Sequence, residues 1–282
     1  MILIADSGST KTDWRLLKQG KIIASFQTIG LNPFFKTSKE ITQVLQAIVQ
    51  KHIPSLDEVQ TIYFYGAGCS SIPKNQLVLK AFRQVFAPTT TIHIQHDLLG
   101  AAIALCGNQK GIVSILGTGS NSCVFDGKKI TQEQVSLGYI LGDEGSGATI
   151  GKQLITDYLY GVLPDYLSQS FKEKYNLSKE YILDRVYKEP LPNRFLASFM
   201  PWISEHIATE AYLQYLVKSA FTDFIQKHIL AYQESKELPL NSVGSVGFYF
   251  QQQLKEVAKE QGIAIGNIIK SPIDGMVKFY TK

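Results

Sequence analysis

The sequence predicts an α/β protein made of two domains of similar design. The chain has 282 residues, a length that suits two domains of moderate size. One pattern, an apolar strand, a glycine-rich polar turn and two further strands joined by a tight turn, occurs over residues 2–26 and again over residues 112–130. Two copies at this spacing indicate a duplicated fold, and we place the boundary near Asn108.

The first domain is predicted to open on three antiparallel strands and then to alternate helices with strands. Ile41, Val44, Leu45 and Ile48 recur at helical spacing, which predicts a helix over 39–52. The remaining elements expected here are strands at 2–5, 13–17, 21–26, 61–65 and 91–94, and helices at 76–85 and 99–105.

The second domain is predicted to repeat the opening strands and then to become mostly helical. Asp126-Gly127 is a typical tight-turn pair between two of these strands. Helices are expected from residue 147 to residue 237, with a break near Pro190. The strands expected in this domain are 112–116, 122–125, 128–130, 242–248 and a short one around 268–269.

Composition excludes several classes of function. The formal net charge is +4 and no block of like charges occurs, so we expect no nucleic-acid partner. No apolar run reaches the roughly 20 residues that span a bilayer, and the start of the chain lacks a signal-peptide pattern, so we expect a cytoplasmic protein with no membrane partner. The three cysteines lack paired spacing, which predicts reduced, buried thiols.

The first glycine-rich turn is a candidate phosphate site. Asp6 ends the opening strand, and small or hydroxylated residues with one lysine follow it. Small residues let backbone amides approach a phosphate, and the acid could hold Mg²⁺ through water molecules. A plain hairpin turn is the alternative explanation. The candidate phosphate ligands are Ser7, Gly8, Ser9, Thr10, Lys11 and Thr12.

The second glycine-rich turn has the same chemistry at the same place in the second copy. Its candidate phosphate ligands are Gly117, Thr118 and Gly119. Two such turns that faced one another could hold a polyphosphate from both sides, so the pair is more specific than either turn alone. We therefore expect a nucleotide between the two domains.

Acidic and amide side chains near these turns are candidates for sugar recognition and catalysis. Asp97 follows a strand and could orient a hydroxyl nucleophile, although a helix N-cap is the alternative. Asp143 and Glu144 lie among glycines before a helix, where carboxylates could accept sugar hydroxyls. Asn32 could bind a sugar or open a turn before Pro33.

A late glycine segment could hold the rest of the nucleotide. Gly244 and Ser245 follow a strand-like run, where the backbone could approach adenine and ribose. A tight turn between a strand and a helix explains the same residues equally well.

Together these motifs resemble the BadF/BadG/BcrA/BcrD ATPase family, and within it the N-acetylglucosamine kinase branch. The resemblance extends over nearly the whole chain. Its most specific parts are the segments that begin at Asp6, Gly117 and Gly142, and weaker matches lie at Gly30–Asn32, Gly244–Gly247 and Pro272–Gly275.

The resemblance implies two ribonuclease-H-like domains of the actin-like ATPase superfamily, which close on ATP and Mg²⁺ in the cleft between them. We expect these domains at 1–108 and 109–273, with the segment 274–282 as a candidate addition to the first. The resemblance also implies a homodimer, and a reaction in which Asp97 acts as the base on the 6-hydroxyl of an amino sugar. The positions that match amino-sugar contacts of that branch are Asn32, Thr118, Asn121 and Asp143.

Other functions remain open at this point. N-acetylglucosamine is the first substrate expected, with glucosamine and N-acetylmuramic acid behind it. An activase-type ATPase would need an iron–sulfur cluster, and Cys69, Cys106 and Cys123 offer no obvious ligand pair. A zinc-bearing sugar-kinase relative would carry a cysteine-rich motif that this sequence lacks. A non-catalytic sugar or nucleotide sensor would not need Asp97.

Overall fold

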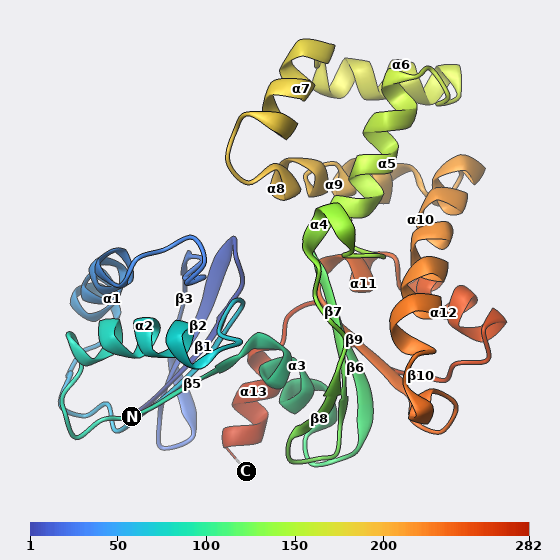
Figure 1. The fold of residues 1–282 in the computed structure, drawn as a ribbon. Coiled ribbons are helices and arrows are strands. Elements are labelled where there is room, and N and C mark those ends of the chain that lie inside the picture. The colour runs from blue at the N-terminus through green and yellow to red at the C-terminus, as the bar shows by residue number, and fades with distance from the viewer. Residues whose placement is uncertain (282) are drawn as a thin grey trace. The chain divides into compact units, whose positions relative to one another are not determined.

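The computed structural model describes residues 1–281 as two compact units (Figure 1). Unit 1 contains Met1–Asn108 and the chain from Pro272 onward, and unit 2 contains Gln109–Ser271. Each unit has its own five-stranded sheet. This confirms the predicted α/β class. Within residues 1–281, no helix is both long and apolar enough to cross a bilayer.

The sheet of unit 1 is mixed. Its strand order is β3-β2-β1-β4-β5, with β1 antiparallel to β2 and parallel to β4. β5 is parallel to β4. The elements of this unit are β1 (Ile2–Ser7), β2 (Lys11–Lys18), β3 (Lys21–Ile29), α1 (Ser38–His52), β4 (Thr61–Gly66), α2 (Ile72–Arg83), β5 (Thr91–His96), α3 (Asp97–Cys106) and α13 (Ile273–Tyr280).

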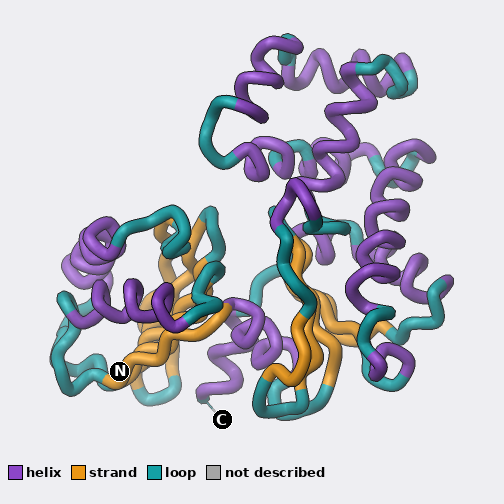
Figure 2. The backbone as a smooth tube through the Cα atoms, viewed as in Figure 1, coloured by secondary structure: helices purple, strands orange, loops and turns teal. Residues whose placement is uncertain are grey.

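Helices cover both faces of this sheet (Figure 2). Helices α1 and α2 share a hydrophobic core with one sheet face, in which Trp14, Phe64 and Phe82 are fully buried. Helix α1 starts on a capping box, because the Thr37 hydroxyl accepts from the backbone of Glu40 while the Glu40 carboxylate accepts from the backbone of Thr37. Helices α3 and α13 contact β1 and each other outside that core.

The sheet of unit 2 has the same plan. The order β10-β9-β6-β7-β8 places β6 at the centre, with antiparallel β7 on one side and parallel β9 on the other. β6 therefore corresponds to β1, and the sequence repeat is a structural repeat. The strands are β6 (Gly111–Leu116), β7 (Ser120–Phe125), β8 (Ile130–Glu133), β9 (Leu240–Val243) and β10 (Ile265–Ile269).

Unit 2 carries a larger helical part than unit 1 (Figure 2). Its core contains the fully buried Trp202, Phe171 and Phe221. The α-helices are α4 (Gly138–Leu141), α5 (Gly147–Leu159), α6 (Asp165–Tyr175), α7 (Lys179–Tyr187), α8 (Pro192–Ala197), α9 (Met200–His206), α10 (Ala211–Phe224), α11 (Ser245–Tyr249) and α12 (Gln251–Glu260). A π-helix spans Ile225–Ile229 and a 3-10 helix spans Gln233–Lys236.

Two predicted strands have different bounds. The strand predicted at 242–248 is wrong in its second half, because Gly244 adopts a φ of +123° and α11 begins at Ser245. The strand predicted at 128–130 starts later, at Ile130. The Asp126 carboxylate accepts from the backbone amides of Lys128 and Lys129, both at 2.8 Å, and so keeps these residues in the turn.

Close helix contact ties the C-terminal helix to unit 1. A Cβ at Gly275 would lie 2.6 Å from the carbonyl oxygen of Ala104 on α3, and a Cβ at Gly100 would lie 2.4 Å from the Met276 side chain. The phenol oxygens of Tyr65 and Tyr280 hydrogen-bond to each other. Helix α13 is therefore an integral part of unit 1, although it is distant in sequence.

We predict that Gly275→Ala destabilises unit 1, because the added methyl meets backbone that cannot move away. The expected loss is about 1–3 kcal/mol of unfolding free energy, the usual cost of overpacking. Urea unfolding in a Trp202→Phe background measures this, since Trp14 is then the only tryptophan and reports on unit 1. The exposed Lys278→Ala on the same helix is the control, with an expected change within about 0.5 kcal/mol. Equal stability of the two variants would contradict the prediction.

Candidate functional site

In unit 1, the acidic residues Asp6 and Asp97 lie where three parallel strands reach their carboxyl ends. Ser7 of β1, Gly66 of β4 and His96 of β5 lie in register at this edge of the sheet. Asp6 lies one position before Ser7, and Asp97 follows β5 directly as the first residue of α3. Ligands of open α/β sheets bind outside such carboxyl ends. This edge is therefore the candidate site of unit 1.

The first predicted phosphate turn joins β1 to β2 at this edge. The Gly8 amide donates to the Lys11 carbonyl over 2.9 Å, which closes the turn. Ser7 and Thr12 are fully buried, and their hydroxyls lie 2.8 Å apart. The side chains of Ser7 and Thr12 therefore support the turn from inside. The residues that keep exposed surface are Gly8, Ser9, Thr10 and Lys11.

A second loop packs behind this turn. A Cβ at Gly30 would lie 2.4 Å from the carbonyl oxygen of Gly8, so only glycine fits there. Asn32 is nearly buried, and its amide donates to the Ser9 hydroxyl over 2.8 Å. Its side-chain oxygen accepts from the Phe34 amide at 2.9 Å, as in an Asx-turn. Asn32 thus opens the turn before Pro33 and also orients Ser9.

Asp6 is the most perturbed acid of this edge. Burial, followed by the negative charges of Asp97 and Asp13, raises its pKa to about 7, and the Lys11 ammonium opposes this shift. Carboxylates that disfavour one another's charge attract a divalent cation. Within residues 1–281, no group of three or more His, Cys, Asp or Glu side chains is placed to ligate a metal directly. The residues at this edge that could face a hydrated Mg²⁺ are the carboxylates of Asp6, Asp13 and Asp97.

Asp97 is the first residue of α3, and His96 is the N-cap of that helix. The sequence alternative, in which Asp97 is itself the N-cap, is therefore wrong. The Nε2 atom of His96 lies 3.0 Å from a carboxylate oxygen of Asp97, whose side chain keeps 21% of its surface exposed. A carboxylate at this place can accept a proton while the adjacent imidazole steadies its position.

The second predicted phosphate turn lies at the carboxyl end of β6 in unit 2. The Gly117 amide donates to the Gly119 carbonyl over 3.0 Å. The carbonyls of Gly117 and Thr118 accept from the amides of Gly147 and Ala148, which opens α5 against the turn. Ser146 is the N-cap of α5, with its hydroxyl accepting from the Thr149 amide.

Glycine is not required by packing at the start of either turn. A Cβ at Gly117 would have no neighbouring atom within 4 Å, and one at Gly8 would meet only the Lys11 carbonyl at 3.7 Å. Neither residue has a positive φ. The fold itself therefore leaves room for a side chain at both positions.

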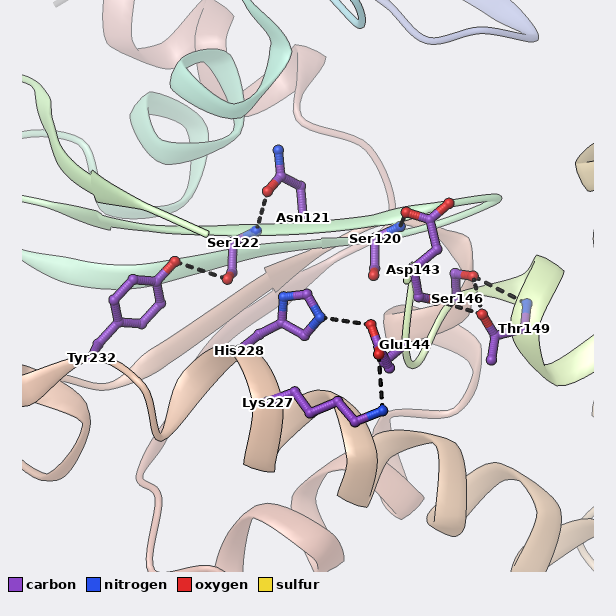
Figure 3. A network of polar contacts seen from close by, with 10 residues as sticks. All are labelled: Ser120, Asn121, Ser122, Asp143, Glu144, Ser146, Thr149, Lys227, His228 and Tyr232. Carbon is purple, nitrogen blue, oxygen red and sulfur yellow. Dashed lines mark hydrogen bonds and ion pairs between the residues drawn. The ribbon is translucent and has the colours of Figure 1, made fainter. Parts of the chain in front are cut away.

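Asp143 faces the second turn from the loop before α5. A carboxylate oxygen lies 3.4 Å from the Ser120 amide, and a Cβ at Gly119 would lie 3.0 Å from the other oxygen (Figure 3). Burial raises the pKa of Asp143, the Ser120 amide opposes the shift, and the Glu144 charge adds to it. Its φ of +58° is unusual for a residue with a side chain.

Glu144 points away from Asp143 and meets the side chains of Lys227 and His228 (Figure 3). One oxygen lies 3.0 Å from Nζ of Lys227, and the other lies 2.9 Å from Nε2 of His228. Burial would raise the pKa of Glu144, but the hydrogen bonds from His228 and Lys227 outweigh it and lower the pKa to about 2. Sequence reasoning missed Lys227 and His228, because they lie more than 80 residues from Glu144 and no motif marks them.

The other predicted residues of unit 2 divide between two places. Asn121 lies on β7 with its side-chain oxygen accepting from the Ser122 amide at 2.8 Å and its amide donating to Glu133 at 3.1 Å. Gly244 packs on the end of β6, where its Cβ would lie 2.3 Å from the Leu116 carbonyl oxygen and 3.2 Å from the Gly117 nitrogen. Gly244 and Ser245 thus adjoin the second turn.

We predict that Asp6 makes the stability of the metal-free protein fall as pH rises from about 4 to about 7. In this window the folded protein keeps the proton, at a pKa of about 7, while the unfolded chain has released it near 3.8. Above pH 7 this contribution is lost and the dependence on Asp6 ends. Urea unfolding of wild type and Asp6→Asn in EDTA should show the slope only in wild type. Parallel curves would contradict the prediction.

Solved structures and curated proteins resemble this chain over almost its whole length. A structure from Porphyromonas gingivalis, described provisionally as an N-acetylglucosamine kinase, is 42% identical and covers 100% of this chain and 99% of its own, with a TM-score of 0.95. An N-acetylmuramic acid/N-acetylglucosamine kinase from Clostridium acetobutylicum is 25% identical over 93% of this chain and 85% of its own.

A more distant structure supports the fold alone. The provisional N-acetylglucosamine kinase from Chromobacterium violaceum is 19% identical and covers 99% of this chain and 98% of its own, with a TM-score of 0.74. The paired sheets are those of the actin-like ATPase fold. The model of the BadF/BadG/BcrA/BcrD ATPase family matches residues 5–159, more than half of the sequence. By this match, and by the identity to the Porphyromonas structure over the full length, the chain belongs to the BadF/BadG/BcrA/BcrD ATPase family.

Proposed function

We propose that this protein is an ATP-dependent kinase that phosphorylates the 6-hydroxyl of an amino sugar, with N-acetylglucosamine as the first substrate. The observation that carries the proposal is the pair of turns at Gly8 and Gly117. Each ends the central strand of its sheet, and each begins with a glycine that packing does not require. The names of the relatives, both of which act on or are assigned to amino sugars, give the substrate class.

In this proposal each turn is a phosphate-binding element for ATP. The other backbone amides of the two turns, at Ser9, Thr10, Thr118 and Gly119, would supply the donors, with the Lys11 ammonium adding charge. Gly244 and Ser245 would lie against adenosine, since they adjoin the second turn. Asp6 would hold Mg²⁺ through water, and the ion would neutralise charge that develops on the transferred phosphoryl group.

Asp97 is the proposed base. Phosphoryl transfer depends mainly on positioning and charge stabilisation, and a carboxylate that accepts the hydroxyl proton orients the nucleophile. Asp97 lies at the carboxyl edge of the sheet and influences the pKa of Asp6, so the two carboxylates are neighbours. A base next to the cation site can act on a hydroxyl that is in line with the phosphate.

The amino sugar would be bound by Asn32 from unit 1 and by Thr118, Asn121 and Asp143 from unit 2. Asp143 is the strongest of these candidates. Its carboxylate is nearly buried beside the second turn and accepts only a long hydrogen bond of 3.4 Å from the Ser120 amide, so lone pairs remain for sugar hydroxyls.

The protonation of two cysteine thiols and the placement of all three favour the kinase over the activase alternative. Burial raises the pKa of Cys69 to about 12 and that of Cys106 to about 11, whereas cluster ligands are thiolates. Cys123 is buried in unit 2, and the other two cysteines belong to unit 1.

The experiment that tests the proposal is an ADP-release screen of the purified protein with Mg²⁺ and ATP. N-acetylglucosamine, N-acetylmuramic acid, glucosamine, N-acetylmannosamine and glucose are compared at equal concentration. We expect the highest kcat/KM with N-acetylglucosamine and a product phosphorylated at the 6-position. ADP release that no sugar stimulates would refute the kinase proposal.

We predict that Asp97→Asn lowers kcat by roughly 10²–10⁴-fold, because the amide cannot accept the hydroxyl proton. Nucleotide affinity should stay near wild type, since no phosphate contact is removed. Steady-state kinetics and a calorimetric titration with an ATP analogue measure the two quantities. An Asn variant with wild-type turnover would remove Asp97 from the role of base.

A further inference from the structure

We propose that Glu144, Lys227 and His228 form a positioning device for Asp143, and that Glu144 anchors the sugar-binding turn instead of contacting the sugar. The inference rests on the proposed kinase function, and it reassigns one of the residues predicted from sequence. It concerns the turn Asp143–Ser146 and the end of α10, both within unit 2.

The carboxylate of Glu144 is already engaged on both oxygens. Lys227 and His228 take one oxygen each at 3.0 and 2.9 Å, and the Glu144 side chain is only 15% exposed. A sugar hydroxyl would have to compete with two charge-assisted partners. The lowered pKa of Glu144 agrees with a carboxylate that these partners keep ionised. Glu144 is therefore better suited to fix the backbone than to bind a ligand.

The two partners come from an unusual piece of helix. α10 ends at Phe224, and Ile225–Ile229 continues it as a π-helix. Single π-turns within helices are rare overall, and those that occur are often found at functional sites. Here the wider turn carries Lys227 and His228 in succession, and both side chains reach the same carboxylate (Figure 3).

The same stretch of helix also contacts the turn through Phe224. A Cβ at Gly145, whose φ is +73°, would lie 2.9 Å from the Cβ of Phe224. The rings of Phe224 and His228 stack with centroids 5.2 Å apart. The turn is thus held at Glu144 by two polar contacts and at Gly145 by an apolar one, so its backbone has little freedom to shift.

Histidine at position 228 is energetically unfavourable by itself. Its side chain is 12% exposed, and its Nδ1 atom has no hydrogen-bond partner among residues 1–281. A buried polar atom without a partner destabilises the folded state. An apolar residue would pack at this position without that penalty. We therefore attribute the presence of histidine to the contact between its Nε2 atom and Glu144.

What the device positions is Asp143. The backbone of Asp143 adopts the left-handed conformation, and its carbonyl accepts from the Ser146 amide at 3.1 Å and from the Thr149 hydroxyl at 2.7 Å. Its carboxylate faces Ser120 and Gly119. Since Glu144 is the next residue, release of its side chain lets Asp143 relax and moves the carboxylate away from the sugar.

The test compares His228→Leu with two reference variants. His228→Gln keeps an amide donor of similar reach and should largely restore function. Lys218→Met removes a lysine of α10 that pairs with Glu256 of α12 at 2.5 Å. This variant is the control for the loss of a helix ion pair. Lys227→Met provides a second disruption if the leucine variant does not fold, as judged by thermal unfolding.

We expect His228→Leu to reduce kcat/KM for the sugar by up to about 100-fold, since small misplacements in an active site have this effect. The KM for ATP should stay within about twofold of wild type, because the phosphate turn is untouched. Gln at 228 should recover most of the loss, and Lys218→Met should behave as wild type. A merely structural ion pair would change the unfolding midpoint without this split between sugar and ATP.

Two failures can be told apart. A wild-type protein with no amino-sugar kinase activity would overturn the proposed function and this inference with it. An active wild type, together with folded His228→Leu and Lys227→Met variants whose sugar kinetics are unchanged, would overturn only the inference.

Discussion

The register of the central strand in each sheet is the constraint on which the proposed site depends. β1 and β6 pair with an antiparallel strand on one side and a parallel strand on the other. The antiparallel partner must start within a few residues, so a tight turn is forced to the edge at which the parallel strands end. Backbone amides and acidic side chains are thereby brought to one edge of each unit.

Neighbouring residues hold each of these turns in place. In unit 1 the buried pair Ser7 and Thr12 ties the turn from within, and Gly30 allows a second loop to pack behind it. In unit 2 the carbonyls of Gly117 and Thr118 bind the first amides of α5. In both cases the glycine at the start of the turn has no neighbouring atom that would exclude a side chain.

Local signals in the sequence were sufficient for the strands and for the repeat. Apolar runs that end in polar, glycine-rich turns mark β1 and β6, and these occupy the same central place in their two sheets. The second half of the strand predicted over 242–248 failed because α11 begins at Ser245, directly after Gly244 in an unusual conformation. Periodicity over so few residues does not separate a strand from a short helix.

Residues that act through tertiary contacts could not be predicted. Nothing near Lys227 and His228 in the sequence indicates a π-helix or a carboxylate more than 80 residues earlier. The same is true of the hydrogen bond from Asn32 to Ser9, which lies more than 20 residues earlier. Sequence therefore marked Asp143 and Glu144 as candidates, whereas only the structure gives their different contacts, with Ser120 for Asp143 and with Lys227 and His228 for Glu144.

The most direct test of the account is a calorimetric titration of a magnesium ATP analogue into wild type, Gly8→Ala and Gly117→Ala. Both alanines fit the fold, so folding and unfolding midpoints should not change. If each turn lies against the phosphates, each methyl blocks close approach and weakens nucleotide binding by about tenfold or more, the effect of one lost hydrogen bond to a charged group. Wild-type affinity in both variants would contradict the claim that these turns hold the nucleotide.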